Sequence, residues 1–142
     1  MSARRRSLEL PGLSHNVPIP MGSRVGNVIY SSAISGKNAD TGVLSDDPAE
    51  QARQAFRNMR RLLEQGGATL EDVVRVSVYL KELGGREAIA APWLESFPDP
   101  HSRPARHAVV THLRNGMLLQ IEFVAVEDDR FPAPAAGTWR QP

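Results

Sequence analysis

The spacing of apolar and polar residues changes along the chain and predicts strands in some segments and helices in others. Apolar residues alternate on both sides of Gly26-Asn27, which predicts two short strands near 17–24 and 28–35. Alternation returns in the segment 69–80, where one face of a strand is expected to carry Val74, Val76, Val78 and Leu80. These strands are expected to face a common core.

Two other segments are predicted to be helices. The first is expected to begin at Asp46 or Asp47, which can cap it, with Pro48 in its first turn, and to end at Gly66-Gly67. Its apolar residues recur with helical spacing, at positions 52, 55, 56, 59, 62 and 63. A shorter helix is expected over 84–97, interrupted by Pro92.

The segments 103–113 and 116–127 are predicted to be strands joined at Arg114-Asn115-Gly116, because Asn-Gly is typical of a tight hairpin turn. Counted from this turn, position 106 would pair near position 124. The element order is then ββαβαββ, without a repeat of solenoid length. It predicts an α+β fold in which one mixed sheet carries both helices packed on one face.

The second face of this sheet is expected to need a cover. Along the last strand, positions 118, 120 and 122 are half apolar and positions 119, 121 and 123 are fully apolar, so neither side is wholly polar. Two helices cannot cover both faces. Association of copies into a closed symmetric ring is the ordinary remedy, and we expect it here.

Length and composition predict a single domain over 1–142, with irregular arms at 1–14 and 128–142. A net charge of +1 gives no global field that would recruit nucleic acid or a membrane surface. The absence of cysteine excludes disulfides and thiolate catalysis. The basic first residues lack the apolar stretch of a signal peptide, and no segment approaches the roughly 18 apolar residues of a membrane span. A cytoplasmic location is therefore expected.

Arg106 is the first candidate for chemistry, because it begins a predicted strand directly after Pro104-Ala105. A guanidinium is a planar fork that can hold a carboxylate through two hydrogen bonds. Pro104 restricts Arg103 to extended geometry, which stiffens the approach to the strand. The alternative is a surface arginine paired with an acidic side chain.

Gln120 and Glu122 share one face of the last strand, and Glu122 is a candidate general base or an interface ion-pair partner. In the predicted hairpin, Gln120 lies roughly 13 Å along the strand from the partner of Arg106, and Glu122 about half as far, which suits a small molecule between them. His107 and His112 are five residues apart, so strand alternation places them on opposite faces. No metal site is expected.

Several stretches together resemble one known family. RPARHAVV…LLQIEFVAV resembles the C-terminal signature of the RidA family, also called YjgF, in which Pro-Ala-Arg begins a strand and Ile/Val-Glu-Ile follows a short loop. VGNVIYSSAIS is similar to the family's Gly-Asn-hydrophobic-Ser-Gly strand. The stretch EQARQAFRNMRRLLEQGGATLEDVVRVSVYLKEL is similar to its long helix and following strand, and WLESFPD to its second helix. The resemblance runs from about residue 16 to residue 127.

The resemblance implies a chorismate-mutase-like fold, a homotrimer, and ligand sites in the clefts between subunits. It also implies hydrolytic deamination of reactive enamines and imines, such as 2-aminoacrylate, to 2-oxo acids and ammonia. The family uses neither a metal nor an organic cofactor, so none is expected.

Residue by residue, the resemblance places Arg106 on the carboxylate-binding arginine, Ser32 on a strand serine, and Gln120 on a water-positioning glutamate, with Glu122 two residues beyond. Other family positions carry different residues here: Ala33 for a glycine whose amide contacts ligand, Ile19 for a ligand-facing tyrosine, Ala90 for an asparagine, Ala108 for a cysteine, and His107 for a small residue. A glutamine can orient water but cannot act as a carboxylate base. An altered substrate specificity is therefore expected.

Two alternatives to a deaminase follow from the same residues. One is a non-catalytic trimer that binds small carboxylates, as a sensor or partner-binding protein. The other is a ribonuclease or translation inhibitor, a label given to some members of the family. The near-neutral charge and the lack of a basic, aromatic face make nucleic acid the weaker expectation.

Overall fold

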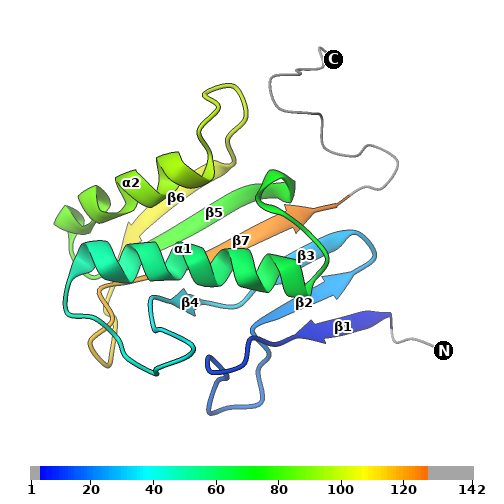
Figure 1. Cartoon of the computed structure of the whole chain (residues 1–142), viewed down its shortest axis with the longest axis horizontal. Coiled ribbons are helices and arrows are strands. Elements are labelled where there is room, and N and C mark those ends of the chain that lie inside the picture. Colours follow the sequence, from blue (N-terminus) through cyan, green and yellow to red (C-terminus); the bar gives the residue numbers. More distant parts are fainter. Residues whose placement is uncertain (1–3, 128–142) are drawn as a thin grey trace.

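The computed structural model describes residues 4–127 (Figure 1). They form one seven-stranded sheet, in which six strands lie side by side and a short seventh strand pairs with one of them, and two α-helices. The elements in chain order are β1 (Arg5–Leu8), β2 (Gly22–Val25), β3 (Val28–Ser31), β4 (Ile34–Ser35), α1 (Pro48–Gln65), β5 (Val73–Leu80), α2 (Arg86–Ser96), β6 (Ala105–Val110) and β7 (Leu119–Val126). Two short 3-10 turns, Leu70–Asp72 and Leu83–Gly85, precede β5 and α2.

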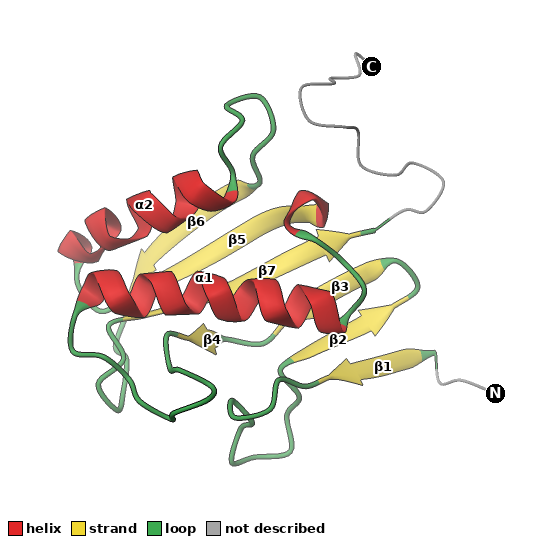
Figure 2. Ribbon diagram, in the orientation of Figure 1, coloured by secondary structure: helices red, strands yellow, loops and turns green. Residues whose placement is uncertain are grey.

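The strands lie in the order β1-β2-β3-β7-β5-β6, and β4 pairs with β7 beside β3. All of these pairs are antiparallel except β5 with β6, which is parallel. Both helices lie on the same face of this mixed sheet (Figure 2). The predicted α+β fold, with one sheet and two helices on a single face, is confirmed.

Helix α1 forms as its sequence predicts. The Asp47 side chain caps it by accepting a hydrogen bond from the backbone N–H of Glu50, and Pro48 takes the first helical position. Gly66 ends it. The residues at the six predicted apolar positions are all buried against the sheet: Ala52, Ala55, Phe56, Met59, Leu62 and Leu63.

The predicted hairpin between the last two strands is wrong. The Asn-Gly turn itself exists, since Asn115 and Gly116 have φ of 59° and 80° and the N–H of Met117 bonds to the carbonyl of Arg114. The strands on either side of it do not pair, because β5 lies between β6 and β7. Arg106 is accordingly opposite Val76 of β5, not a residue near 124.

The first residues are not the irregular arm that we expected. Strand β1 pairs antiparallel with β2 at the edge of the sheet, and Leu8, Leu10 and Leu13 are buried in the core. Hydrophobic burial therefore fixes this segment. The expected C-terminal arm, 128–142, lies outside the described residues.

Two further expectations need local corrections. Val74 is exposed, because a β-bulge between Val73 and Arg75 shifts the alternation of β5 by one residue, whereas Val76, Val78 and Leu80 face the core as predicted. Helix α2 continues from Arg86 to Ser96 through Pro92 without an interruption. The predicted strands near 17–24 and 28–35 are shorter, and the second is divided into β3 and β4.

The face of the sheet away from the helices carries apolar side chains that this chain leaves exposed. By strand alternation with the buried Ile29 and Ala125, this face holds Val25, Val28, Tyr30 and Val126, and Tyr30 is 59% exposed. An apolar face of this kind is typical of a surface that meets a partner. Within the described part of the chain, neither helix is long and apolar enough to cross a membrane.

Candidate functional site

The approach to β6 is fixed by the end of α2. Phe97 follows this helix and is buried, with its ring 4.8 Å from that of Trp93 in an edge-to-face arrangement. Arg103 donates from Nε to the Phe97 carbonyl at 2.9 Å and from Nη2 to the Pro98 carbonyl at 3.4 Å. These bonds, with Pro104, bring the chain into β6 in one direction, so that Arg106 is the second residue of the strand.

Arg106 extends from β6 toward α2, on the same side of the sheet as the buried Val76 and Val78. Its guanidinium carbon lies 4.7 Å from the centre of the Trp93 ring, a cation–π contact that holds the group in place. The ion pairs of residues 4–127 do not include Arg106. The predicted alternative, an arginine paired with an acidic side chain, is not what the described residues show.

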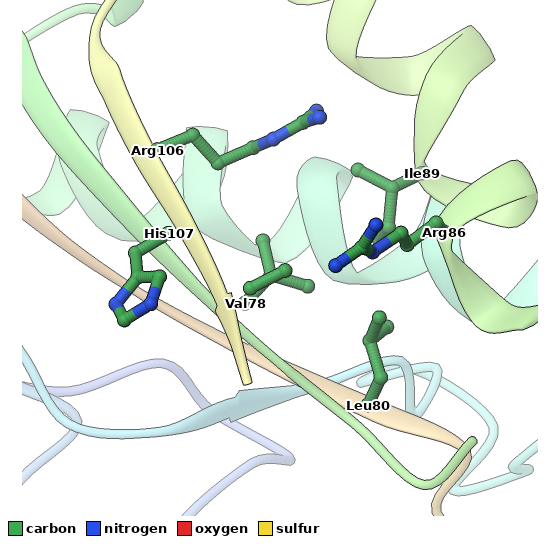
Figure 3. Close-up of a pocket in the computed structure, with 7 residues that line it drawn as sticks. Val78, Leu80, Arg86, Ile89, Arg106 and His107 are labelled. Atoms are coloured by element: carbon green, nitrogen blue, oxygen red, sulfur yellow. The ribbon is translucent and has the colours of Figure 1, made fainter. Parts of the chain in front are cut away.

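A cavity of about 350 Å³ opens beside Arg106, between the sheet and the start of α2 (Figure 3). Val78, Leu80, Ile89 and Ala108 form the apolar part of its wall, His107 also lines it, and Arg86 adds a second guanidinium. No acidic residue lines it. Apolar walls with a few convergent charged groups are typical of small-molecule sites, and this arrangement favours a small anion.

His107 belongs to the same stretch of strand but its ring points away from the guanidinium of Arg106 (Figure 3). It lies opposite Ser77 of β5, on the face of the sheet that the helices leave uncovered. The strand alternation predicted from the sequence is therefore observed for this pair. His107 lines the cavity, but its ring is turned away from the guanidinium of Arg106.

A second group of candidate residues lies around the break between β3 and β4. Ser32 donates from Oγ to the carbonyl of Pro20 at 2.8 Å, which ties this break to the segment that carries Ile19. Ala33 is half-buried, and the side chain of Ile19 is 51% exposed. Gln120 lies close by on β7, opposite Ser35 of β4.

Gln120 and Glu122 both lie on the uncovered face of the sheet, because Leu119, Ile121 and Phe123 alternate with them and are buried. The amide nitrogen of Gln120 is 3.2 Å from the Met117 sulfur. Glu122 accepts a hydrogen bond of 2.6 Å from the hydroxyl of Tyr79. The Glu122 hydrogen bond, with burial and the glutamate's charge, raises the pKa of Tyr79 above its ordinary value.

The expected arrangement of Arg106 facing Gln120 and Glu122 across one ligand is therefore wrong for a single chain. Arg106 is on the helix side of the sheet, whereas Gln120 and Glu122 are on the other side, two strands away. The prediction failed because it assumed that β6 and β7 are neighbours. Two other candidates, His107 and Ala108, line the cavity together with Arg106.

Sequence reasoning missed Arg86, which lines this cavity, and Trp93, which contacts the guanidinium of Arg106. Trp93 was assigned only to a helix, and Arg86 was given no role. The signal that points to Arg86 is its position at the start of a helix directly after Gly84-Gly85. That signal becomes informative only when β6 is known to lie beside α2. Among residues 4–127, no group of three or more His, Asp or Glu side chains is placed to hold a metal ion.

Comparison with known proteins gives a family match over most of the chain. The family model described as Endoribonuclease L-PSP matches residues 19–127. A RutC family protein of Pyrococcus abyssi is 34% identical over 113 residues, which are 78% of this chain and 87% of that protein. The 2-iminobutanoate/2-iminopropanoate deaminase of Escherichia coli K12 is 33% identical over 112 residues, 77% of this chain and 87% of that enzyme.

Solved structures agree with this match. The YjgF gene product of Escherichia coli superimposes with a TM-score of 0.78 at 27% identity, covering 87% of this chain and 99% of that one. RidA from an Antarctic Psychrobacter superimposes with a TM-score of 0.77 at 26% identity, covering 89% of this chain and 100% of that one. The family match over residues 19–127 includes both helices and the strand that carries Arg106.

Proposed function

Because the chain belongs to the Endoribonuclease L-PSP family, which includes the YjgF and RidA proteins, we propose that it is a hydrolytic deaminase of small 2-imino acids. The observation that carries this proposal is the guanidinium of Arg106, held over Trp93 at the edge of a small cavity and without an acidic partner among the described residues. A relative that shares 33% of its residues is named a 2-iminobutanoate/2-iminopropanoate deaminase.

In the proposed reaction, Arg106 binds the carboxylate of the substrate through two charge-assisted hydrogen bonds, which fixes the neighbouring imine carbon. Water adds to this carbon as a C–O bond forms. A proton passes from the added water to nitrogen, and the C–N bond then breaks. The protonated imine and one water thus give a 2-oxo acid and ammonium, and neither an oxidant nor a reductant is needed.

The water is proposed to be positioned by Gln120, whose Oε1 can accept a hydrogen bond from it. The amide nitrogen of the same side chain is turned to the sulfur of Met117, which leaves the oxygen as the group offered to water. Glu122 lies two residues along the same face and already accepts the hydroxyl of Tyr79. In this proposal Glu122 supports the local hydrogen-bond network on the uncovered face.

A site that uses both Arg106 and Gln120 has to be shared between copies of the chain, since the two lie on opposite faces of one sheet. We propose a homotrimer in which each cleft takes Arg106 and Ala108 from one subunit and Ile19, Ser32, Ala33 and Gln120 from the next. Two features support this. Strand β6 is at the end of the sheet, and the face that carries Gln120 is uncovered and also holds the exposed apolar side chains of Val25, Tyr30 and Val126.

The second candidate function is carboxylate binding without catalysis. It is favoured by Gln120, because an amide cannot accept a proton as a carboxylate base does, and by the engagement of Glu122 with Tyr79. Deamination and carboxylate binding both use Arg106, but only a deaminase converts its ligand to a product. One assay therefore separates them.

The assay generates 2-iminobutanoate in solution and follows the formation of 2-oxobutanoate above the uncatalysed rate. A deaminase accelerates it, and Arg106→Gln lowers kcat/KM by about tenfold to a hundredfold, the worth of a charge-assisted hydrogen bond. Arg60→Gln, on the exposed side of α1, is the matched control and leaves the rate unchanged. If the parent protein does not accelerate the reaction but still binds 2-oxobutanoate through Arg106, the result favours carboxylate binding without catalysis.

Mixing two variants of low activity tests the shared site. Arg106→Gln and Gln120→Ala chains, unfolded and refolded together, form hybrid trimers in which one of the three clefts has both groups intact. Activity returns on mixing if each cleft takes one group from each of two subunits. Mixed samples no more active than the separate variants, at the same mass by light scattering, contradict the shared cleft.

A further inference from the structure

The cavity beside Arg106 contains a second arginine, for which the proposed deamination has no use. Arg86 is the first residue of α2 and lines the same cavity as Arg106, with its guanidinium directed toward Val78 (Figure 3). The ion pairs formed within the described part of the chain include neither arginine. The cavity thus holds two cationic groups and no anionic one.

The two arginines enter the cavity from opposite ends. Arg106 lies opposite Val76 of β5, and the start of α2 packs on Leu80, whose Cδ2 is 3.2 Å from the position that a Cβ on Gly85 would take. Val76 and Leu80 are four residues apart, which is about 13 Å along a strand. Both side chains line the same cavity of about 350 Å³, so a small molecule bound there can contact both of them.

The charge of the cavity indicates what that molecule carries. A single carboxylate is satisfied by one guanidinium fork, so a substrate with one carboxylate would leave the other arginine without a partner. Two like charges that line one small cavity repel each other, although both arginines are exposed and solvent screens part of this repulsion. Both effects are relieved when the ligand brings one negative group to each end.

We infer that the substrate is a small 2-imino acid with a second carboxylate, of the kind derived from an acidic amino acid. Arg106 binds the carboxylate next to the imine, as in the proposed deamination, on which this inference rests. Arg86 binds the distal carboxylate and sets the specificity, and the methylene groups between them lie on Val78 and Ile89. The volume of about 350 Å³ is at the small end of the range for ligand sites, which agrees with a chain of few carbons.

The experiment compares two stable 2-oxo acids of equal carbon number by isothermal titration calorimetry. 2-Oxoglutarate carries a second carboxylate where 2-oxopentanoate carries a methyl group. We expect the parent protein to bind 2-oxoglutarate about tenfold to a hundredfold more tightly, the difference expected for one charge-assisted hydrogen-bonded pair. In Arg86→Gln this ratio falls close to one, in Arg86→Lys it is intermediate, and Arg60→Gln, the matched control on α1, keeps the parent ratio.

Two results would overturn the inference: equal affinity of the parent for both acids, or an Arg86→Gln variant that keeps the parent's preference. Circular dichroism and the thermal midpoint show that each variant is folded. A different result would show that the proposed deaminase function, rather than the second carboxylate, is wrong. If Arg106→Gln binds 2-oxopentanoate as tightly as the parent does, the carboxylate clamp itself is wrong. If only the preference for 2-oxoglutarate fails, the clamp stands and the second carboxylate is wrong.

Discussion

Replacing Gln51 with methionine removes a buried amide that connects helix α1 to two loops. Gln51 is 0% exposed, and its side chain makes three hydrogen bonds to backbone groups. Nε2 donates to the carbonyls of Ser45 at 2.6 Å and Gly116 at 3.0 Å, and Oε1 accepts from the N–H of Leu118 at 2.9 Å. Methionine has nearly the same length and fills the space, so the change isolates the polar contacts.

The expected loss follows from where these backbone groups lie. Three hydrogen bonds at about 1 kcal/mol each give about 3 kcal/mol. Gly116 is exposed and Ser45 half-buried, so water can reach their carbonyls after the substitution and recovers part of this. We therefore expect the free energy of unfolding to fall by about 2 kcal/mol, with the unpaired N–H of half-buried Leu118 as the main contribution.

The free energy of unfolding is measured by urea denaturation at equal protein concentration, because association of subunits would otherwise change the apparent stability. Gln65→Met is the matched control, since Gln65 is exposed in the last turn of the same helix, and we expect a change within about 0.5 kcal/mol. A Gln51→Met protein as stable as the parent, or a loss of the same size in the control, would refute the assignment of stability to these bonds.

Three further predictions concern other contacts. Trp93→Leu removes the ring under Arg106 and should weaken binding of a 2-oxo acid about twofold to fivefold, whereas Trp93→Phe weakens it less; equal affinities in calorimetry would contradict the cation–π role. Because the pKa of Tyr79 is raised in the folded state, its hydroxyl adds to the free energy of unfolding below a pH of about 10, and this contribution is lost as the pH rises further. Urea denaturation of Tyr79→Phe at increasing pH should not show this loss. Gly36→Ala should cost about 3 kcal/mol in urea denaturation, because a Cβ would lie 2.2 Å from a backbone oxygen of α1, whereas Gly84→Ala, with open space around it, should cost under about 1 kcal/mol.

The sequence was most informative where structure depends on neighbours along the chain. Helix α1 has its cap, its first-turn proline and its apolar stripe within one segment, and each was found where expected. The turn at Asn115-Gly116 was also correct as a turn. The sequence did not reveal which strands pair, because the insertion of β5 between β6 and β7 depends on contacts between segments far apart in the chain. The position of Arg106 in the sheet was wrong for this reason.

The candidate site shows the same limit. Arg106 was identified from its own surroundings in the sequence, and the structure places it at a cavity. Its neighbours Trp93 and Arg86 come from α2, and nothing in their local sequence indicates that the helix would lie beside β6. The roles expected of Ser32 and Gln120 come from the family resemblance and stay predictions.

The position of β6 at the end of the sheet has a consequence for how such a protein can change over evolution. Arg106 and Arg86 belong to elements at the border of the molecule, and neither side chain is part of the hydrophobic core. Replacing them alters the charge offered to a ligand while the packing between α1 and the central strands stays intact. New ligand preferences can therefore arise at this border with little loss of folding stability.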